Sequence, residues 1–284
     1  MSAEIINGKV LAQQLKDKMK EEVDLLKDKG LTPHLTVVLV GNNPASRSYV
    51  NGKKKASAAT GISSEIIELP ETTSEESLLD TITELNNNPE VHGILVQLPL
   101  PNHIAQQKVI EHIDPSKDVD GFHPVNIGRM MTGKNTFLPC TPFGIVTMLK
   151  SKNIPIEGQH VVVLGRSNIV GKPVGQLLLN ENATVTYCHS KTKDLKAFTK
   201  MADILIVAVG KPNVIGAEYI KPGAAVIDVG INRLENGSLT GDVNFDDVKE
   251  IAAYITPVPK GVGPMTITML LQNTIKAAKG LKLQ

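Results

Sequence analysis

The feature that most constrains this chain is an alternation of short strand-like segments with longer segments of helical periodicity. Residues 35–40 and 93–97 are almost continuously apolar, whereas 9–29 and 45–59 repeat their apolar side chains at helical spacing. Near-continuous apolar strands are typical of a parallel sheet that is covered by helices on both faces. We therefore expect an α/β fold built on parallel strands.

The alternation restarts after Gly158, with strands expected near 160–165, 183–188, 204–209 and 225–229. A chain of 284 residues with 41% hydrophobic residues is long enough to bury two cores. The sequence therefore predicts two α/β domains with parallel sheets, the second of Rossmann type, and a cleft between them.

A turn bracketed by two prolines, Pro139–Pro142, marks the expected joint between the domains. We place the first domain at residues 1–142 and the second at 143–264. The final segment, 265–284, repeats apolar side chains on one helical face, and we expect this helix to pack back onto the first domain.

Charge and cysteine content exclude several kinds of partner. Lys plus Arg number 30 and Asp plus Glu 29, so no global field attracts nucleic acid or an anionic membrane. Cys140 and Cys188 are too few for a disulfide framework, and we expect them to be reduced in a cytoplasmic protein. The seven histidines show no metal-ligand spacing, and no apolar stretch suits a signal peptide or a membrane span. We therefore expect no metal, and any anion site must be local.

A glycine-punctuated turn follows the strand expected at Val161–Leu164. Gly165, Gly171 and Gly175 would let backbone amides approach a pyrophosphate at the N-terminus of the next helix. The spacing is wider than in the usual dinucleotide fingerprint, so an ordinary structural turn remains an alternative.

The end of the next strand indicates which dinucleotide would bind. Folds specific for NAD place an acidic residue there, about 20 residues beyond the glycines, to bind the ribose hydroxyls. The corresponding segment, Tyr187–Lys193, holds no carboxylate, and Arg166 follows the first glycine. This combination favours a ribose that carries a 2′-phosphate, and hence NADP. The alternative is that Lys191 and Lys193 form a solvated basic turn.

In the first domain, Ser46, Tyr49 and Lys53 share one face of an expected helix, which places a phenol beside an ammonium group. Such a pair can move protons. A Tyr-x-x-x-Lys pair also occurs in short-chain dehydrogenases, but there it follows the glycine turn, whereas here it precedes it. An ordinary surface helix is the other alternative.

Three further segments are suited to contact a ligand. Gln97 ends a buried strand, where open α/β sheets bind ligands. Asp118 and Asp120 precede a glycine turn and could bind an amino-pyrimidinone ring through paired hydrogen bonds, although an Asx turn would also explain them. Thr256–Pro264 is too rigid and glycine-rich for an ordinary linker and is suited to contact a ligand through its backbone.

Six segments, taken in order, resemble one family. They are Ser46-x-x-Tyr49-x-x-x-Lys53, Gly93–Pro101, Lys117–Gly121, Pro139–Pro142, Gly165–Pro173 and Thr256–Pro259. Together they resemble the bifunctional methylenetetrahydrofolate dehydrogenase/cyclohydrolases of the FolD type. The resemblance implies oxidation of 5,10-methylenetetrahydrofolate by NADP to the 5,10-methenyl form, and then hydrolysis to 10-formyltetrahydrofolate. It also implies a cytoplasmic homodimer that serves one-carbon metabolism and purine biosynthesis, with the first domain as the catalytic, folate-binding one.

The resemblance implies roles for individual residues. Lys53 is the expected acid/base of hydrolysis and Gln97 orients it, while Tyr49 stacks on the folate and Asp120 holds the pterin. Further substrate contacts are expected at Val96, Leu98, Pro259, Lys260, Gly261, Val262 and Gly263. Cofactor contacts are expected at Gly165, at Arg166 and Ser190 for the 2′-phosphate, at Ser167 for the other phosphates, and at Ile231 beside the nicotinamide.

One residue departs from the family pattern, which usually has Pro-Gly-Gly-Val-Gly-Pro where this chain has Pro259-Lys260-Gly261-Val262-Gly263-Pro264. If the position needs a positive φ or a close backbone approach, Lys260 costs about 1 kcal/mol or more and weakens binding or turnover. Alternatively, its ammonium group could meet the carboxylates of a polyglutamyl folate tail.

Two other functions remain open from the residues alone. One is an NADP dehydrogenase for a different small substrate, based on the glycine turn and the Tyr49/Lys53 pair. The other is a non-catalytic module that senses a dinucleotide, in which Tyr49 belongs to an ordinary surface helix.

Overall fold

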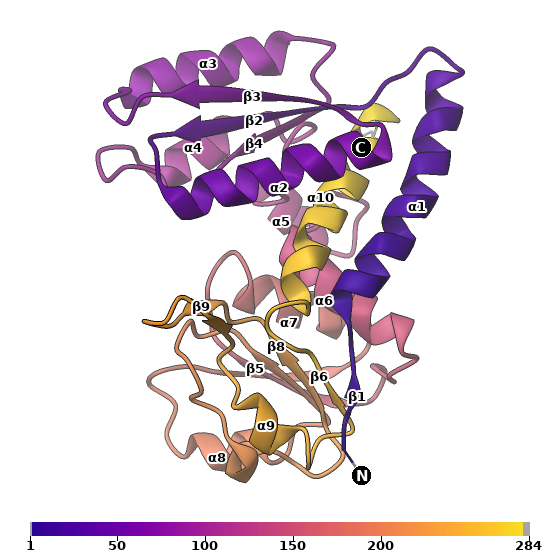
Figure 1. Cartoon of the computed structure of the whole chain (residues 1–284), viewed down its shortest axis with the longest axis vertical. Coiled ribbons are helices and arrows are strands. Elements are labelled where there is room, and N and C mark those ends of the chain that lie inside the picture. Colours follow the sequence, from indigo (N-terminus) through magenta and orange to yellow (C-terminus); the bar gives the residue numbers. More distant parts are fainter. Residues whose placement is uncertain (1, 281–284) are drawn as a thin grey trace. The chain divides into compact units, whose positions relative to one another are not determined.

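The computed structural model describes residues 2–280, with Ala45 in its backbone only. The chain folds into two compact α/β units, each built from segments that are distant in the sequence (Figure 1). Unit 1 contains the residues up to Gln13 and Pro139–Thr266, and unit 2 contains Gln14–Leu138 and the residues from Ile267 onward. The expected α/β fold with parallel sheets is confirmed. Residues 281–284 of the helix expected at 265–284 lie outside the described residues.

Unit 2 is built on a three-stranded parallel sheet. The central strand, β2 (His34–Val40), pairs with β3 (Ser63–Leu69) on one side and β4 (Gly93–Val96) on the other. Helices α3 (Glu75–Asn87) and α2 (Pro44–Thr60) cover opposite faces of this sheet (Figure 1). The face under α3 buries apolar side chains of both elements, and the central strand is buried on both faces. Such burial explains the continuous apolar sequence of β2.

Within the described residues, unit 2 contains four further helices or parts of helices. They are α4 (Gln106–His112), α5 (Pro124–Met131) and parts of α1 (Gly8–Lys27) and α10 (Val262–Ala278), which also contribute residues to unit 1. Within unit 2, Asn273 of α10 donates to the carbonyls of Val119 at 2.8 Å and Leu138 at 3.0 Å. Lys276 donates to the carbonyl of Thr136 at 2.6 Å. These bonds attach the C-terminal helix to the segment that precedes α6.

Unit 1 is built on a six-stranded parallel sheet. In spatial order the strands are β1 (Glu4–Ile5), β11 (Tyr254–Ile255), β8 (Ala225–Asp228), β7 (Ile204–Val207), β5 (His160–Leu164) and β6 (Thr184–Cys188). The four longer strands lie where the sequence predicts them. Strand β1 comes from a segment that we expected in the first domain, but it pairs with β11 in this sheet. A two-residue strand is too short to produce a periodic signal.

Helices cover this sheet, and a short hairpin follows strand β8. The helices are α6 (Cys140–Ser151), α7 (Gly171–Asn180), α8 (Leu195–Thr199) and α9 (Phe245–Val248), with a short η1 turn (Ala217–Tyr219). Strands β9 (Asn232–Arg233) and β10 (Leu239–Thr240) form an antiparallel pair after β8. The carboxyl ends of all the parallel strands lie at one edge of the sheet, so the loops that follow them are neighbours.

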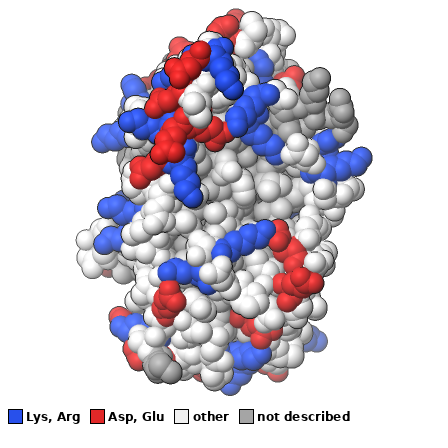
Figure 2. All heavy atoms as spheres, turned by 90° about the vertical axis from the view of Figure 1, so that its right-hand side faces the viewer, with Lys and Arg blue, Asp and Glu red and all other residues white. Residues whose placement is uncertain are grey.

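Surface charge follows the balanced composition. On the face drawn in Figure 2, positive and negative side chains are interspersed over the described residues. This mixing agrees with the formal net charge of +1. No helix within residues 2–280 is long and apolar enough to cross a membrane.

Candidate functional site

In unit 2, the buried Lys53 and the half-buried Gln97 form a polar pair at the carboxyl end of β4. Lys53 is 9% exposed, and its Nζ donates to Oε1 of Gln97 at 2.7 Å. Nε2 of Gln97 donates to the carbonyl of Leu98 at 2.6 Å, which leaves Oε1 as the oxygen that faces the lysine. The direction of the amide is thereby fixed, and Gln97 can only accept from Lys53.

Tyr49 lies one helical turn before Lys53 on α2 and presents its ring to solvent, with 45% of its area exposed. Ser46, on the same helical face, is buried, and its amide donates to Oδ1 of Asn43 at 3.2 Å. The predicted helix therefore provides an exposed aromatic ring directly beside a buried amine. Lys54 and Lys55 of the same helix are exposed.

The two carboxylates before Gly121 differ in what they do. Oδ1 of Asp118 accepts from the amide of Gly121 at 3.1 Å, and Oδ2 accepts from the amide of His123 and from Asn126, each at 2.8 Å. Burial raises the pKa of Asp118, and these hydrogen bonds oppose the rise. Asp118 is therefore the Asx-type residue that shapes the loop, as the alternative explanation required. Asp120 is half-buried two residues further on.

In unit 1, the glycine turn after β5 depends on the absence of side chains. Gly165 has φ +129°, and a Cβ there would lie 2.3 Å from the carbonyl oxygen of Ala208. A Cβ on Gly171 would lie 2.4 Å from the carbonyl oxygen of Gly165. Oγ of Ser167 accepts from the amides of Val170 and Gly171, both at 3.2 Å. Gly175 has a different function, because it makes room inside α7 for the ring of Tyr187.

A cavity of about 360 Å³ opens beside this turn, and we call it the Arg166 cavity. It lies at the carboxyl ends of β5, β6 and β7, and its polar lining residues are Arg166, His189, Ser190 and Lys211. The rest of the lining is mostly apolar. Lys191 and Lys193 are exposed and are not among its lining residues. Lys211 was not expected from the sequence, although it is the first charged residue after the adjacent strand β7.

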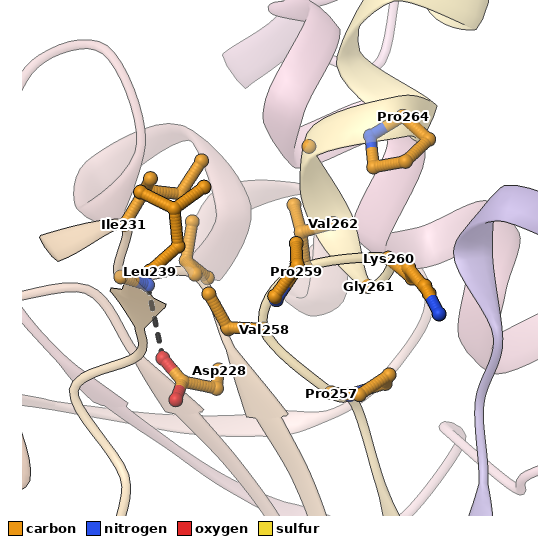
Figure 3. A pocket seen from close by; sticks show the side chains of 13 residues that line it. Asp228, Ile231, Leu239, Pro257, Val258, Pro259, Lys260, Gly261, Val262 and Pro264 are labelled. Carbon is orange, nitrogen blue, oxygen red and sulfur yellow. Dashed lines mark hydrogen bonds between the residues drawn. The ribbon is translucent and has the colours of Figure 1, made fainter. Parts of the chain in front are cut away.

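A second cavity, of about 230 Å³, lies further along the same sheet edge, and we call it the Ile231 cavity (Figure 3). The segment Asp228–Ile231 and the loop Pro257–Pro264 line it, together with Leu239. Five predicted substrate contacts, Pro259, Lys260, Gly261, Val262 and Gly263, therefore line one cavity with the residue predicted beside the nicotinamide.

Lys260 has φ +85°, so its backbone has the positive φ for which glycine is favoured. Its side chain is exposed, and the ammonium group points away from Ile231 and Asp228 (Figure 3). Its neighbour Gly261 cannot be replaced without a shift, because a Cβ would lie 2.4 Å from the carbonyl oxygen of Pro257. The positive φ that would strain a lysine at position 260 is therefore present.

Two buried aspartates organise the loops between these cavities. Asp228 accepts backbone hydrogen bonds from Gly230 at 3.0 Å, Asp242 at 3.0 Å and Val243 at 2.9 Å. Burial raises the pKa of Asp228 to about 6, against the effect of those three bonds. Asp242 is fully buried and accepts from Asn232 and from three successive backbone amides, Val209 to Lys211. Neither aspartate was expected from the sequence.

The predicted site residues thus fall into three groups. Val96 is buried at the end of β4, next to Gln97 and Leu98, and belongs with Lys53 in unit 2. Gly165, Arg166 and Ser190 belong to the Arg166 cavity, with Ser167 in its turn, and Ile231 belongs to the second cavity with the Pro257–Pro264 loop. Among the described residues, no group of three or more His, Cys, Asp or Glu side chains could hold a metal ion.

A glycine turn at the carboxyl edge of a parallel sheet, beside a basic cavity, defines a dinucleotide-binding enzyme with a second α/β unit. Residues 6–120 match the family described as tetrahydrofolate dehydrogenase/cyclohydrolase, catalytic domain, and residues 139–282 match its NAD(P)-binding domain. The chain belongs to the tetrahydrofolate dehydrogenase/cyclohydrolase family. The resemblance inferred from the six segments is confirmed.

Known relatives match this chain in sequence and structure over nearly its whole length. The bifunctional protein FolD of Oceanobacillus iheyensis is 67% identical over 279 residues, or 98% of each chain. The crystal structure of the bifunctional FolD enzyme from Campylobacter jejuni matches with TM-score 0.97 and 50% identity, over 98% of this chain and 99% of that one. The Trypanosoma brucei FolD, solved in complex with NADP cofactor and an inhibitor, matches with TM-score 0.94 and 41% identity over 98% of both chains. The expected enzyme class, a dehydrogenase/cyclohydrolase with a nicotinamide-dinucleotide domain, is confirmed.

Proposed function

We propose that this protein oxidises 5,10-methylenetetrahydrofolate with NADP and hydrolyses the 5,10-methenyl product to 10-formyltetrahydrofolate. The observation that carries the proposal is the hydrogen bond of the buried Lys53 to Gln97 beside the exposed ring of Tyr49, within the catalytic domain of this family. The Arg166 cavity and the NADP complex of the Trypanosoma brucei relative support NADP as the cofactor.

The residues of unit 1 fit a dinucleotide. Gly165 and Gly171 keep the turn after β5 compact, and the Arg166 cavity offers cationic and hydroxyl groups where a 2′-phosphate would bind. We assign the 2′-phosphate to Arg166 and Ser190, and the other phosphates to Ser167. NADP, when bound, accepts a hydride from the one-carbon bridge.

The protein's task in the oxidation is alignment. The two nitrogens that flank the one-carbon bridge stabilise the cation, so no acid or base is needed at that carbon. We propose that Ile231 lies beside the nicotinamide and that the backbone of Pro259–Gly263 contacts the folate, because both line one cavity of about 230 Å³. An apolar cavity of this kind also keeps water away from the transferred hydride.

Hydrolysis needs proton transfer, and we assign it to Lys53. As a base, the lysine takes a proton from water while the oxygen bonds to the bridge carbon. The bond from this carbon to N5 then breaks, Lys53 returns the proton to N5, and the second proton of the water leaves to solvent. Lys53 is buried, and its hydrogen bond to Gln97 at 2.7 Å directs Nζ. Val96 and Leu98 flank Gln97, and we propose that they contact the substrate.

Two residues bind the folate without taking part in proton transfer. We propose that Tyr49 stacks on a flat ring of the substrate, since its ring is exposed one turn from Lys53. Asp120 accepts hydrogen bonds from the amino-pyrimidinone part of the pterin. Asp118 is excluded from that contact because the loop uses both of its oxygens.

A two-step assay tests the function. Purified protein with methylenetetrahydrofolate and NADP should produce NADPH and then formyltetrahydrofolate, and a failure to form NADPH would refute the oxidation. Lys53→Ala should lower cyclohydrolase kcat by roughly 10²–10⁴-fold while NADPH formation falls much less. Lys54→Ala, on the exposed side of the same helix, is the matched control and should keep both activities. An equal loss of both activities in Lys53→Ala would contradict the assignment.

We propose further that the enzyme is a cytoplasmic homodimer that does not bind nucleic acid, as the resemblance and the balanced charge suggest. Light scattering of the purified protein should give twice the chain mass, and a monomer at micromolar concentration would contradict this. The domain limits at 1–142 and 143–264, with the last helix on the first domain, stay predictions.

A further inference from the structure

We infer that Lys211 is a specificity-determining residue, which supplies a second positive charge to the 2′-phosphate opposite Arg166. The inference rests on the proposed function, in that NADP is the cofactor of unit 1. It adds a residue that neither the sequence pattern nor the family resemblance singled out.

The sheet brings Lys211 and Arg166 to one cavity. Strands β5 and β7 are parallel neighbours, with Leu164 opposite Val207 at their carboxyl ends. Arg166 follows the first strand by two residues and Lys211 follows the second by four, and both line the Arg166 cavity. Two positive charges from adjacent strand ends suit an anion with about two negative charges, such as a phosphate monoester.

The backbone of Lys211 is held firmly. Asp242 accepts from the amides of Val209 at 2.7 Å and of Gly210 and Lys211, each at 2.9 Å. The same carboxylate accepts from Nδ2 of Asn232 at 2.9 Å and is fully buried. Four donors offset the negative charge of Asp242, so this carboxylate fixes the loop without forming an ion pair with the ammonium group of Lys211. Only the side chain of Lys211 must become ordered when an anion binds.

The ammonium group of Lys211 is available. It makes no hydrogen bond or ion pair with any residue from 2 to 280. Two other lysines of this unit are paired in contrast: Lys196 with Glu218 at 3.7 Å, and Lys221 with Asp203 at 2.6 Å. An exposed, unneutralised lysine on the wall of a cavity is suited to bind an anionic ligand.

Lys191 provides a matched control. It lies on the exposed basic turn after β6, directly after Ser190, yet it does not line the cavity. If general positive charge attracted the cofactor, replacing either lysine would weaken its binding equally. If a direct contact in the cavity is required, only the replacement of Lys211 weakens binding.

Calorimetric titration of two probes tests the inference without any reaction. The probes are 2′,5′-ADP, which carries the 2′-phosphate, and 5′-AMP, which lacks it. Lys211→Gln should weaken binding of 2′,5′-ADP roughly tenfold, as expected for one charge-assisted contact at an exposed site, and leave 5′-AMP unchanged. Lys191→Gln should change either affinity less than about twofold, since long-range charge is screened.

Three results would overturn the inference. They are an unchanged affinity of Lys211→Gln for 2′,5′-ADP, an equal loss for both probes, and an equal loss in Lys191→Gln. In each case the wild type still binds 2′,5′-ADP, so the proposed cofactor stands. If the wild type binds neither 2′,5′-ADP nor NADP, the proposed function fails together with the inference.

Discussion

Replacing Lys260 with glycine should make the protein more stable. Lys260 has φ +85°, a conformation in which an L side chain costs roughly 1–2 kcal/mol. Glycine removes this strain but adds about 0.4–1 kcal/mol of chain entropy to the unfolded state. The net gain in the free energy of unfolding is therefore about 0.5–1 kcal/mol.

No other contact of Lys260 should change the free energy of unfolding in this variant. The carbonyl of Lys260 accepts from the amide of Lys9 at 3.0 Å, and a glycine keeps that backbone bond. The side chain is exposed and forms no hydrogen bond or ion pair within the described part of the chain. Lys260→Ala should therefore leave stability nearly unchanged, because it keeps the strained backbone and loses only an exposed side chain.

Thermal unfolding of three variants provides the test. Lys260→Gly should raise the midpoint by about 1–4 °C, whereas Lys260→Ala should stay near the wild type. Lys200→Gly is the control, because Lys200 is an exposed lysine with φ −68°, where glycine relieves nothing and should cost about 0.5–1 kcal/mol. If Lys260→Gly is no more stable than Lys260→Ala, backbone strain at this position is not the cause.

The same variants separate strain from a ligand contact. If the ammonium group of Lys260 bound a polyglutamyl tail, Lys260→Ala would raise KM for pentaglutamyl folate and spare the monoglutamyl form. We expect no such difference, because the ammonium group points away from the Ile231 cavity (Figure 3).

Three further changes test the cofactor site and the buried carboxylate. Arg166→Ala should raise KM for NADP at least about tenfold more than KM for NAD in dehydrogenase assays, and equal losses would exclude a 2′-phosphate contact. Gly171→Ala should cost about 1–3 kcal/mol in urea unfolding, since its Cβ would lie 2.4 Å from the carbonyl oxygen of Gly165. Gly128→Ala, in helix α5 with open space around it, should instead gain about 0.5–1 kcal/mol. Because the pKa of Asp228 is raised from 3.8 to about 6, the folded protein binds that proton more tightly than the unfolded chain, and the carboxyl adds stability as the pH falls. Relative to Asp228→Asn, the wild type should gain about 1.4 kcal/mol between pH 7.5 and 5, and a pH-independent difference would contradict the raised pKa.

The long elements were predictable from sequence because each leaves a local signal, whereas the pairing of Lys53 with Gln97 was implied only by the family resemblance. Burial on both faces makes β2 and β5 continuously apolar, and a polar residue at the end of such a strand lies at the ligand-binding edge. Lys53 lies on the helix that follows the neighbouring strand, so both residues reach the same edge. The distance of 2.7 Å between them still had to come from the structure.

Lys211 and β1 were not predictable in this way because their signals are not local. Lys211 looks like one more surface lysine until the order of the strands places its loop beside Arg166. Strand β1 has only two residues, and its pairing with β11 joins segments about as far apart as the chain allows. Pairing of this kind depends on the whole fold and leaves no periodicity.

The two aspartates between the cavities lie in short polar segments whose structural role is not visible in the sequence. In the sequence, Asp228-Val229-Gly230 and Gly241-Asp242 resemble ordinary surface turns. In the fold each glycine makes room for the other aspartate: a Cβ on Gly230 would lie 2.2 Å from Oδ1 of Asp242, and one on Gly241 would lie 1.8 Å from Oδ2 of Asp228. The two glycines and the two carboxylates therefore depend on one another, and the conformation of each segment requires the other segment.

This reciprocal packing has a consequence for the cofactor site. Asp242 holds the Val209–Lys211 loop of the Arg166 cavity, while Asp228 holds the amide of Gly230, next to Ile231 of the second cavity. The two carboxylates are joined because the amide of Asp242 donates to Oδ1 of Asp228 at 3.0 Å. The spacing between the Arg166 cavity and the Ile231 cavity is thus set by buried hydrogen bonds. A loss of either carboxylate should change both cavities together, which a contact in one cavity alone would not do.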